Sequence, residues 1–254
     1  MHPFFESQKE ADECILDAGG FLGVPRECLN IVGGVKGAFT GRISIKENGQ
    51  WVDCSKDGPS GRPITRDILR LEHDDIDAKF ILVIEKDGIF NRLSEDLFFD
   101  NLPCILITGK GFPDLATRCF VKKLGDVLQV PILGLCDCNA FGLSILLTYK
   151  LGSARMPLDS IHYAVDIQWI GLRPSQVEAL ALPNVVKKKC TKQDKLRTKS
   201  LLLHPFIQMH PNYQVEIELW LSDPFKVELE ALHTNGFGFL GQFVLDAIMN
   251  ADYF

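Results

Sequence analysis

The chain has 254 residues, of which 46% are hydrophobic, and its formal net charge at pH 7 is −6. This length and apolar content can bury one large core or two smaller ones. The acidic balance excludes nucleic-acid binding through net charge alone, so such binding would need a local basic surface or bound cations. No apolar stretch reaches the length of a membrane span, and the charged N-terminus has no signal-peptide core. The eight cysteines contain no C-x-x-C pair, which favours reduced thiols in the cytosol or nucleus.

Residues 1–70 differ from the rest of the chain in their pattern of turns, because glycine-rich turns divide them into short segments. Within them the sequence predicts a short helix over Asp12–Phe21. It also predicts a β-hairpin around Asn48-Gly49, which lies between two short apolar segments. The acidic segment Leu71–Asp77 is the predicted linker to a second domain, residues 78–254.

From residue 78 onward, short apolar runs alternate with segments of helical periodicity. Continuous apolar runs of this length are typical of parallel strands that are buried on both faces. The predicted strands are 80–84, 104–108, 132–136 and 167–172. The predicted helices between them are 90–98, 113–128 and 143–149, and most of 192–203 and 214–250 is also predicted to be helical. This order indicates an α/β fold with a parallel sheet and flanking helices.

Two of the predicted strands break off at carboxylates. Glu85 follows the first strand and Asp137 follows the third. Residues just past the carboxyl ends of neighbouring parallel strands converge on one crevice, so these two side chains should meet. Two adjacent carboxylates repel each other at neutral pH and call for a cation between them. The pattern predicts a site for Mg²⁺ or Mn²⁺, although Glu85 alone could equally cap the next helix or pair with Lys86.

Three further positions bear on this site. Asn139 follows Asp137 by two residues and could add an amide oxygen, but without a negative charge a second metal ion is doubtful. Asp87 could assist as a ligand or simply cap a helix. Gly109-Lys110-Gly111 forms a strand-to-helix turn where a phosphate could approach the backbone and Lys110. Gly236–Gly241 matches G-x-G-x-x-G but follows no predicted strand, so we interpret it as a helix connection.

Basic residues suggest where DNA could bind. Lys36 lies in a glycine-rich stretch that could form a wing, and Lys86 and Lys110 flank the predicted crevice. Arg118 is predicted to lie on the exposed side of the helix over 113–128. Between Lys187 and Lys199 there are seven basic residues and one acidic residue, which indicates either a phosphate contact or an ordinary solvated face.

The ordered set of motifs resembles a known family. The motifs are Ile84-Glu-Lys-Asp87, Thr108-Gly-Lys-Gly111, Asp137-x-Asn139 and Trp169-Ile-Gly-Leu-Arg-Pro174. Together they resemble the Toprim domain of the topoisomerase VI A-type family, which includes a eukaryotic relative, the transesterase that makes meiotic double-strand breaks. The resemblance implies a Rossmann-like Toprim fold, preceded over residues 1–70 by part of a winged-helix domain and followed by a helical extension. It also implies that Glu85, Asp137 and Asn139 hold Mg²⁺.

The same resemblance implies the wider function. Family members belong with the ATP-hydrolysing type II DNA topoisomerases and cleave both strands of DNA in the nucleus. They act as dimers of A-type subunits together with a topoisomerase VI B-like subunit. Their nucleophile is a tyrosine of the winged helix, and none of Tyr149, Tyr163, Tyr213 and Tyr253 has that setting.

In the resemblance, Met1 falls just after the tyrosine pair, so we expect no cleavage by this chain alone. A truncated reading frame, an alternative start and a natural short isoform stay open as explanations. A non-catalytic, dimerising DNA-binding module and a Toprim nuclease or primase-like enzyme stay open as alternative functions.

Overall fold

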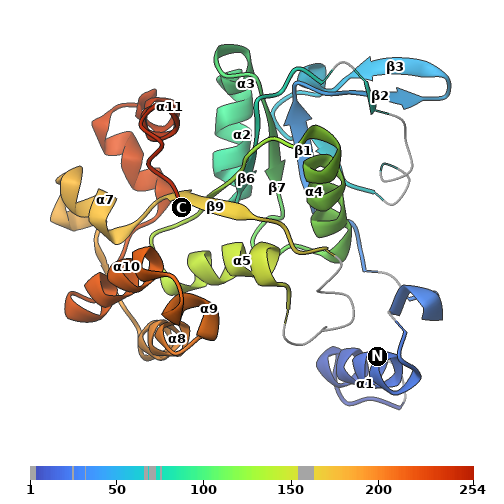
Figure 1. Cartoon of the computed structure of the whole chain (residues 1–254), viewed down its shortest axis with the longest axis horizontal. Coiled ribbons are helices and arrows are strands. Elements are labelled where there is room, and N and C mark those ends of the chain that lie inside the picture. Colours follow the sequence, from blue (N-terminus) through green and yellow to red (C-terminus); the bar gives the residue numbers. More distant parts are fainter. Residues whose placement is uncertain are drawn as a thin grey trace.

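The structure is a computed structural model of the chain, and it describes residues 4–24, 26–31, 33–65, 68, 73–74, 76–153 and 163–254. Its centre is a six-stranded sheet of order β4-β1-β7-β6-β8-β9 (Figure 1). Four strands form the parallel part: β6 (Phe80–Ile84), β7 (Cys104–Thr108), β8 (Ile132–Leu135) and β9 (Ile167–Gly171). The predicted α/β fold is confirmed, and two of the predicted strands end one residue earlier than expected.

The sheet continues past the parallel strands at one edge. Strand β1 (Ala38–Gly41) pairs antiparallel with β7, and β4 (Arg62–Pro63) pairs antiparallel with β1. The resemblance assigns residues 1–70, which include β1, to a winged-helix remnant; in the structure the backbone of β1 is part of the central sheet. The hydrophobic core is accordingly continuous between the two predicted domains, from Phe39 to Val83 and beyond. The proposed domain boundary near residue 70 stays a prediction, and this sheet extends across it.

The remainder of the N-terminal part forms smaller elements. The predicted hairpin is present as β2 (Ser44–Glu47) and β3 (Gln50–Asp53), and β5 (His73–Asp74) pairs with β2. Of the predicted linker 71–77, residues 71, 72 and 75 lie outside the described residues, and His73–Asp74 belong to this small sheet. Helix α1 (Gln8–Leu22) lies apart from the sheet in Figure 1, and Gly19 is its one buried residue.

Helices cover both faces of the central sheet. Figure 1 shows α2 (Asp87–Glu95) and α3 (Phe98–Asn101) on one face, and α4 (Leu115–Leu128) and α5 (Ala140–Leu151) on the other. The single helix expected over 90–98 is therefore two short helices, because Leu97 adopts a left-handed conformation with φ 48° between them. Helix α4 begins after Asp114, whose carboxylate accepts a hydrogen bond from the Thr117 amide as an N-cap.

The C-terminal part is less helical than expected. Its helices are α7 (Pro174–Ala179), α8 (Lys192–Leu202), α9 (Pro205–Gln208), α10 (Pro211–Ser222) and α11 (Phe239–Met249), with a 3₁₀ turn over Leu229–Asn235. The prediction of a mostly helical 214–250 is wrong at β11 (Phe225–Lys226), which pairs with β10 (Lys188–Lys189). This two-stranded ribbon carries the chain to the edge of the central sheet, where Val227 and Cys138 form an isolated bridge.

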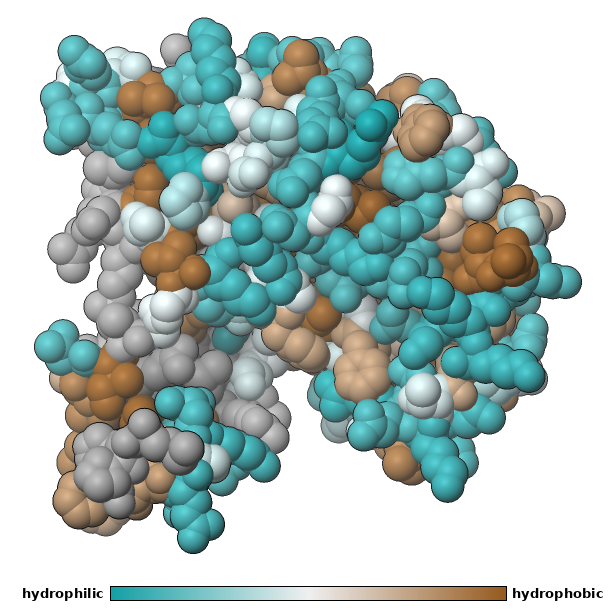
Figure 2. Space-filling model, turned by 180° about the vertical axis from the view of Figure 1, so that it is seen from behind, coloured by the Kyte–Doolittle hydropathy of each residue, from teal (hydrophilic) through white to brown (hydrophobic). Residues whose placement is uncertain are grey.

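Most of the surface seen in Figure 2 is hydrophilic. Hydrophilic side chains cover most of this rear face, and apolar ones form small separate groups. None of the helices in the described ranges is long and apolar enough to cross a bilayer. Strand β9 forms the edge of the sheet opposite β4. There the backbone amide of Trp169 donates a hydrogen bond to the carbonyl of Phe254, so the C-terminal residues close this side of the core.

Candidate metal centre

Glu85 and Asp137 meet at the carboxyl edge of the sheet. Strands β6 and β8 are parallel neighbours, and each carboxylate follows the end of its strand. The Oε2 atom of Glu85 accepts a hydrogen bond from the backbone amide of Asp137 at 2.9 Å. The Asp137 side chain is 6% exposed, whereas Glu85 is half-buried. The predicted convergence of the two carboxylates is therefore what the geometry shows.

Burial makes both carboxylates hard to ionise. It raises the pKa of Glu85 to about 7, and the neighbouring charge of Asp137 adds to this shift. Burial also raises the pKa of Asp137, although the backbone amide of Leu229 and the Lys86 ammonium act in the opposite direction. A carboxylate pair whose charges are disfavoured in this way gains from a nearby cation.

The cation that the protein itself supplies is Lys86. Its Nζ atom lies 3.1 Å from Oδ2 of Asp137, 2.7 Å from Oε2 of Glu230 and 3.6 Å from Oε2 of Glu228. Burial lowers the pKa of Lys86, but the hydrogen bond to Glu230 and the charge of Asp137 outweigh it, so the net shift is upward. The sequence predicts a DNA contact for this ammonium, and in this structure it is directed into a cage of three carboxylates.

Glu228 and Glu230 were missed by the sequence analysis. They enter the site because the β10–β11 ribbon delivers the following residues to the Asp137 loop. There the amide of Leu229 donates to Oδ1 of Asp137 at 2.8 Å. In the interior of the helix that the sequence predicts here, these glutamates would be ordinary surface residues. In the sequence, Glu228 and Glu230 stand out only as two acids on either side of Leu229, and this pattern does not indicate that they contact Lys86.

Asn139 is committed to the helix that follows it. Its Oδ1 accepts hydrogen bonds from the amides of Phe141 and Gly142, each at 2.9 Å, and so caps α5. Within the described ranges, no three His, Cys, Asp or Glu side chains are arranged as a ready-made metal cage. The chemistry of Glu85 and Asp137 still fits a hard divalent cation, because the two residues bring carboxylate oxygens to the ends of neighbouring strands. A third ligand from Asn139 would require it to give up its capping role.

Gly142 lets the Glu85 carboxylate and the backbone of Asp137 lie close to α5. A Cβ atom at this position would lie 2.5 Å from the carbonyl oxygen of Asp137 and 3.0 Å from Oε2 of Glu85. Neither atom can retreat without breaking the Glu85–Asp137 hydrogen bond. The site thus depends on a glycine in the first turn of the helix.

Two other predicted DNA contacts lie near the same edge of the sheet. Lys110 occupies the turn after β7 with φ 51°, and its Nζ lies 3.3 Å from Oδ1 of Asp87. Asp87 is thereby a partner of Lys110 in the first turn of α2, rather than a member of the carboxylate pair. Lys36 donates from Nζ to the carbonyl of Phe112 at 2.7 Å and from its backbone amide to Asp114. Both lysines are positioned around the start of α4.

Arg118 contradicts its predicted exposure, since it is only 1% exposed. It lies three residues before Val121, at the border of the apolar stripe of α4. Strand β1 packs on another part of this helix, where the tilted rings of Phe39 and Phe120 have centroids 4.6 Å apart. Because Arg118 is buried, it does not present its guanidinium to DNA in this structure.

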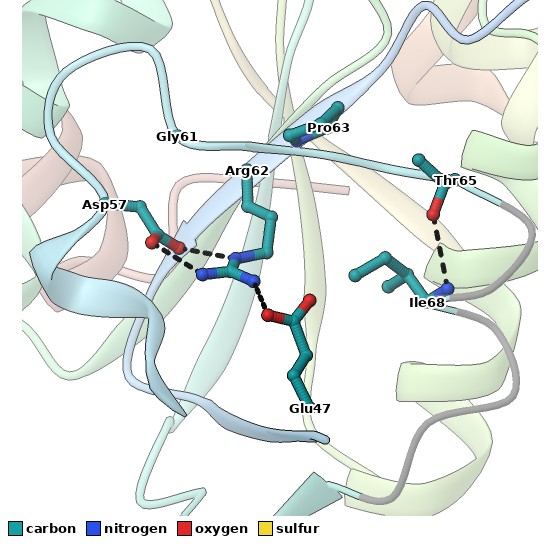
Figure 3. Close-up of a pocket in the computed structure, with 7 residues that line it drawn as sticks. All are labelled: Glu47, Asp57, Gly61, Arg62, Pro63, Thr65 and Ile68. Carbon is teal, nitrogen blue, oxygen red and sulfur yellow. Dashed lines mark hydrogen bonds and ion pairs between the residues drawn. The ribbon is translucent and has the colours of Figure 1, made fainter. Parts of the chain in front are cut away.

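A separate pocket of about 280 Å³ lies beside β4 (Figure 3). Arg62 lies between Asp57 and Glu47, with contacts of 2.9 Å and 2.6 Å respectively. The guanidinium charge is balanced within the pocket, so it does not offer a cation to a phosphate. None of the predicted site residues lines this pocket.

The family assignment follows from comparison with known proteins. Residues 80–247, more than half of the chain, match the family described as the Toprim domain of Spo11 and of the topoisomerase 6 A subunit. The chain belongs to this family. The matched segment begins at the first residue of β6 and contains the acids of the site, which are Glu85, Asp137, Glu228 and Glu230. The Toprim fold and the family resemblance are both confirmed.

Individual relatives agree with the family match. The chain is 37% identical to the A subunit of DNA topoisomerase 6 from Arabidopsis thaliana, over 95% of its own length and 57% of the relative's length. It is 39% identical to the meiotic recombination protein SPO11-2 of Oryza sativa subsp. japonica, over 98% and 65% of the two lengths. For human SPO11 the identity is 37%, over 90% and 58%. The chain therefore spans about three fifths of the length of these relatives.

Proposed function

We propose that this chain is the metal-binding part of a protein that breaks double-stranded DNA in the nucleus during meiotic recombination. The observation that carries the proposal is the pair of Glu85 and Asp137 at neighbouring strand ends, in a chain of the Spo11 and topoisomerase 6 A-type family. The names of its relatives, a DNA topoisomerase subunit and a meiotic recombination protein, support this context. Membership of the ATP-hydrolysing topoisomerase class is part of the same proposal.

Glu85 and Asp137 would hold Mg²⁺ or Mn²⁺. When bound, such an ion supplies electrostatic stabilisation of charge on a scissile phosphate. The chain's own contribution is to hold the Glu85 carboxylate against the Asp137 amide and to bury the Asp137 side chain. Asn139 would position the Asp137 loop by capping the start of α5.

The attacking group and the partner subunits belong to the proposal as well. The family resemblance implies a tyrosine from a winged helix, contributed across a dimer of A-type subunits, and a topoisomerase VI B-like partner. Tyr149 and Tyr213 do not suit this role, because they are 1% and 4% exposed and burial raises the pKa of each. No observation separately favours the alternative of a Toprim nuclease or primase.

The most suitable DNA-binding surface is a row of lysines on α8. Lys192, Lys195 and Lys199 are exposed and lie opposite the helix's buried residues, and we call these three the α8 lysine face. The neighbouring ribbon links this face to the metal centre, since Lys188 Nζ lies 2.6 Å from Glu228, which also faces Lys86. We propose the α8 lysine face as the main phosphate contact, in place of Arg118.

The metal proposal is tested by calorimetric titration with Mn²⁺ and Mg²⁺. We expect a weak single-site isotherm for the natural chain and its loss in Glu85→Gln, because one of the two oxygen donors is removed. Glu95→Gln is the matched control, since this exposed glutamate lies at the end of α2. An isotherm that survives Glu85→Gln would show that any bound ion lies elsewhere.

We expect no covalent protein–DNA adduct when residues 1–254 are incubated with duplex DNA and Mn²⁺. Transesterification needs a hydroxyl in line with the leaving oxygen, close to phosphorus. Tyr163 lies just before β9, at the amino edge of the sheet, and Tyr253 lies on the C-terminal tail beside the middle of that strand. Denaturing gels with labelled DNA provide the measurement. An adduct that disappears with Tyr163→Phe or Tyr253→Phe would place the nucleophile within this chain and would contradict this prediction.

A further inference from the structure

Lys86 occupies an unusual position for a lysine beside a metal centre. Its backbone is fixed, because it directly follows Glu85 and forms the N-cap of α2. Its side chain is 27% exposed and its Nζ atom touches Asp137 on one side and Glu230 on the other. The ammonium therefore has two alternative acidic partners within reach of a small side-chain movement.

The contact with Asp137 is in conflict with metal binding at the same carboxylate. A divalent ion held by Asp137 would face an ammonium that already lies 3.1 Å from one of its oxygens. Two cations at one carboxylate repel each other, and the repulsion is strong in a poorly solvated corner. The metal-free site, in contrast, needs a positive charge, because a buried unpaired carboxylate is costly.

We propose that Lys86 is the resident counterion of this site, that a divalent ion binds by displacing its ammonium from Asp137, and that Glu230, assisted by Glu228, holds the displaced ammonium. Lys86 and Glu230 are then positioning residues that set the metal affinity without being ligands. This inference rests on the proposed metal site but makes its own predictions. It also replaces the predicted contact between Lys86 and DNA.

The first test is the affinity of Lys86→Met for Mn²⁺, measured by calorimetry. Removing the competing charge should tighten binding by about tenfold or more. Lys86→Arg keeps the charge and should bind Mn²⁺ much as the natural chain does. Lys110→Met is the matched control, because Lys110 lies at the same edge of the sheet but pairs with Asp87. Its affinity should be nearly unchanged.

Folding gives an independent measurement. Without metal, Lys86→Met leaves Asp137 buried without its ammonium, so its melting temperature should fall below that of the natural chain. Saturating Mn²⁺ should then raise the melting temperature more in the variant than in the natural chain. If Lys86→Met does not fold without metal, refolding it in Mn²⁺ provides the same comparison.

A double-mutant cycle separates positioning from direct charge effects. Glu230→Gln should weaken Mn²⁺ binding, because Lys86 loses its alternative partner and stays on Asp137. In the Lys86→Met background the same change should have little effect, since there is no ammonium left to hold. An equal loss in both backgrounds would show that Glu230 acts directly on the ion and would overturn its proposed role.

The remaining outcomes distinguish the two proposals. If Glu85→Gln abolishes binding but Lys86→Met leaves the affinity unchanged, the metal site stands and the displacement is wrong. If only Lys86→Met binds Mn²⁺, Lys86 blocks the site in the natural chain, and its displacement by the ion is wrong. If neither the natural chain nor Lys86→Met binds Mn²⁺, both proposals fail.

Discussion

Gly142→Ala should destabilise the chain by about 1–3 kcal/mol, the usual cost of overpacking. The added Cβ would lie 2.5 Å from the Asp137 carbonyl and 3.0 Å from the Glu85 carboxylate. Relief requires the loop before α5 to move, which breaks the 2.9 Å hydrogen bond between Glu85 and the Asp137 amide. We therefore expect Mn²⁺ binding to be lost together with stability. Urea unfolding and calorimetry measure the two effects.

The predicted loss of stability is opposite in sign to the usual effect of this substitution. Alanine in place of glycine within a helix normally stabilises a protein by about 0.4–1 kcal/mol, because it restricts the unfolded chain. Gly88→Ala is the matched control, since Gly88 lies in the first turn of α2 and a Cβ there would meet nothing within 4 Å. That variant should be as stable as the natural chain or slightly more stable. A Gly142→Ala variant that gains stability and keeps its metal would show that the Asp137 loop is free to shift.

Neutralising the α8 lysine face should weaken duplex-DNA binding by at least about tenfold at physiological salt and reduce its salt dependence. The variant is Lys192→Gln/Lys195→Gln/Lys199→Gln. Each lost phosphate contact should lower the slope of log affinity against log salt concentration by about 0.9. The slope is the decisive quantity, because it counts phosphate contacts rather than overall stability. Fluorescence anisotropy over a range of salt concentrations provides it.

The control for this prediction changes the same number of charges elsewhere. Lys9, Lys56 and Lys122 lie on the surface outside α8, and each pairs with an acid three or four residues away. Their replacement by glutamine should leave the slope close to that of the natural chain. Equal losses in both triple variants would show that net charge governs binding. A loss confined to the control would place the DNA-binding surface on another face.

Local sequence patterns were enough to predict the centre of the fold. Strands 80–84 and 104–108 are continuous apolar runs, and runs of this kind have few alternatives once helical segments separate them. The meeting of Glu85 with Asp137 followed from the rule that parallel strand ends converge. Neither inference needed a contact between distant side chains to be known in advance, because hydrogen bonding between strands brings these residues together.

The surroundings of the site depended on tertiary structure. Lys86 meets Glu230 across 144 positions because a two-residue strand, too short to have a periodicity, pairs with another at β10. Arg118 is only 1% exposed, and no feature within α4 indicates this burial. The sequence by itself thus determined the sheet and its carboxylate pair through local periodicity. Tertiary structure alone decided which lysine neutralises that pair and which basic residues remain exposed, because those outcomes depend on long-range packing at the edges of the sheet.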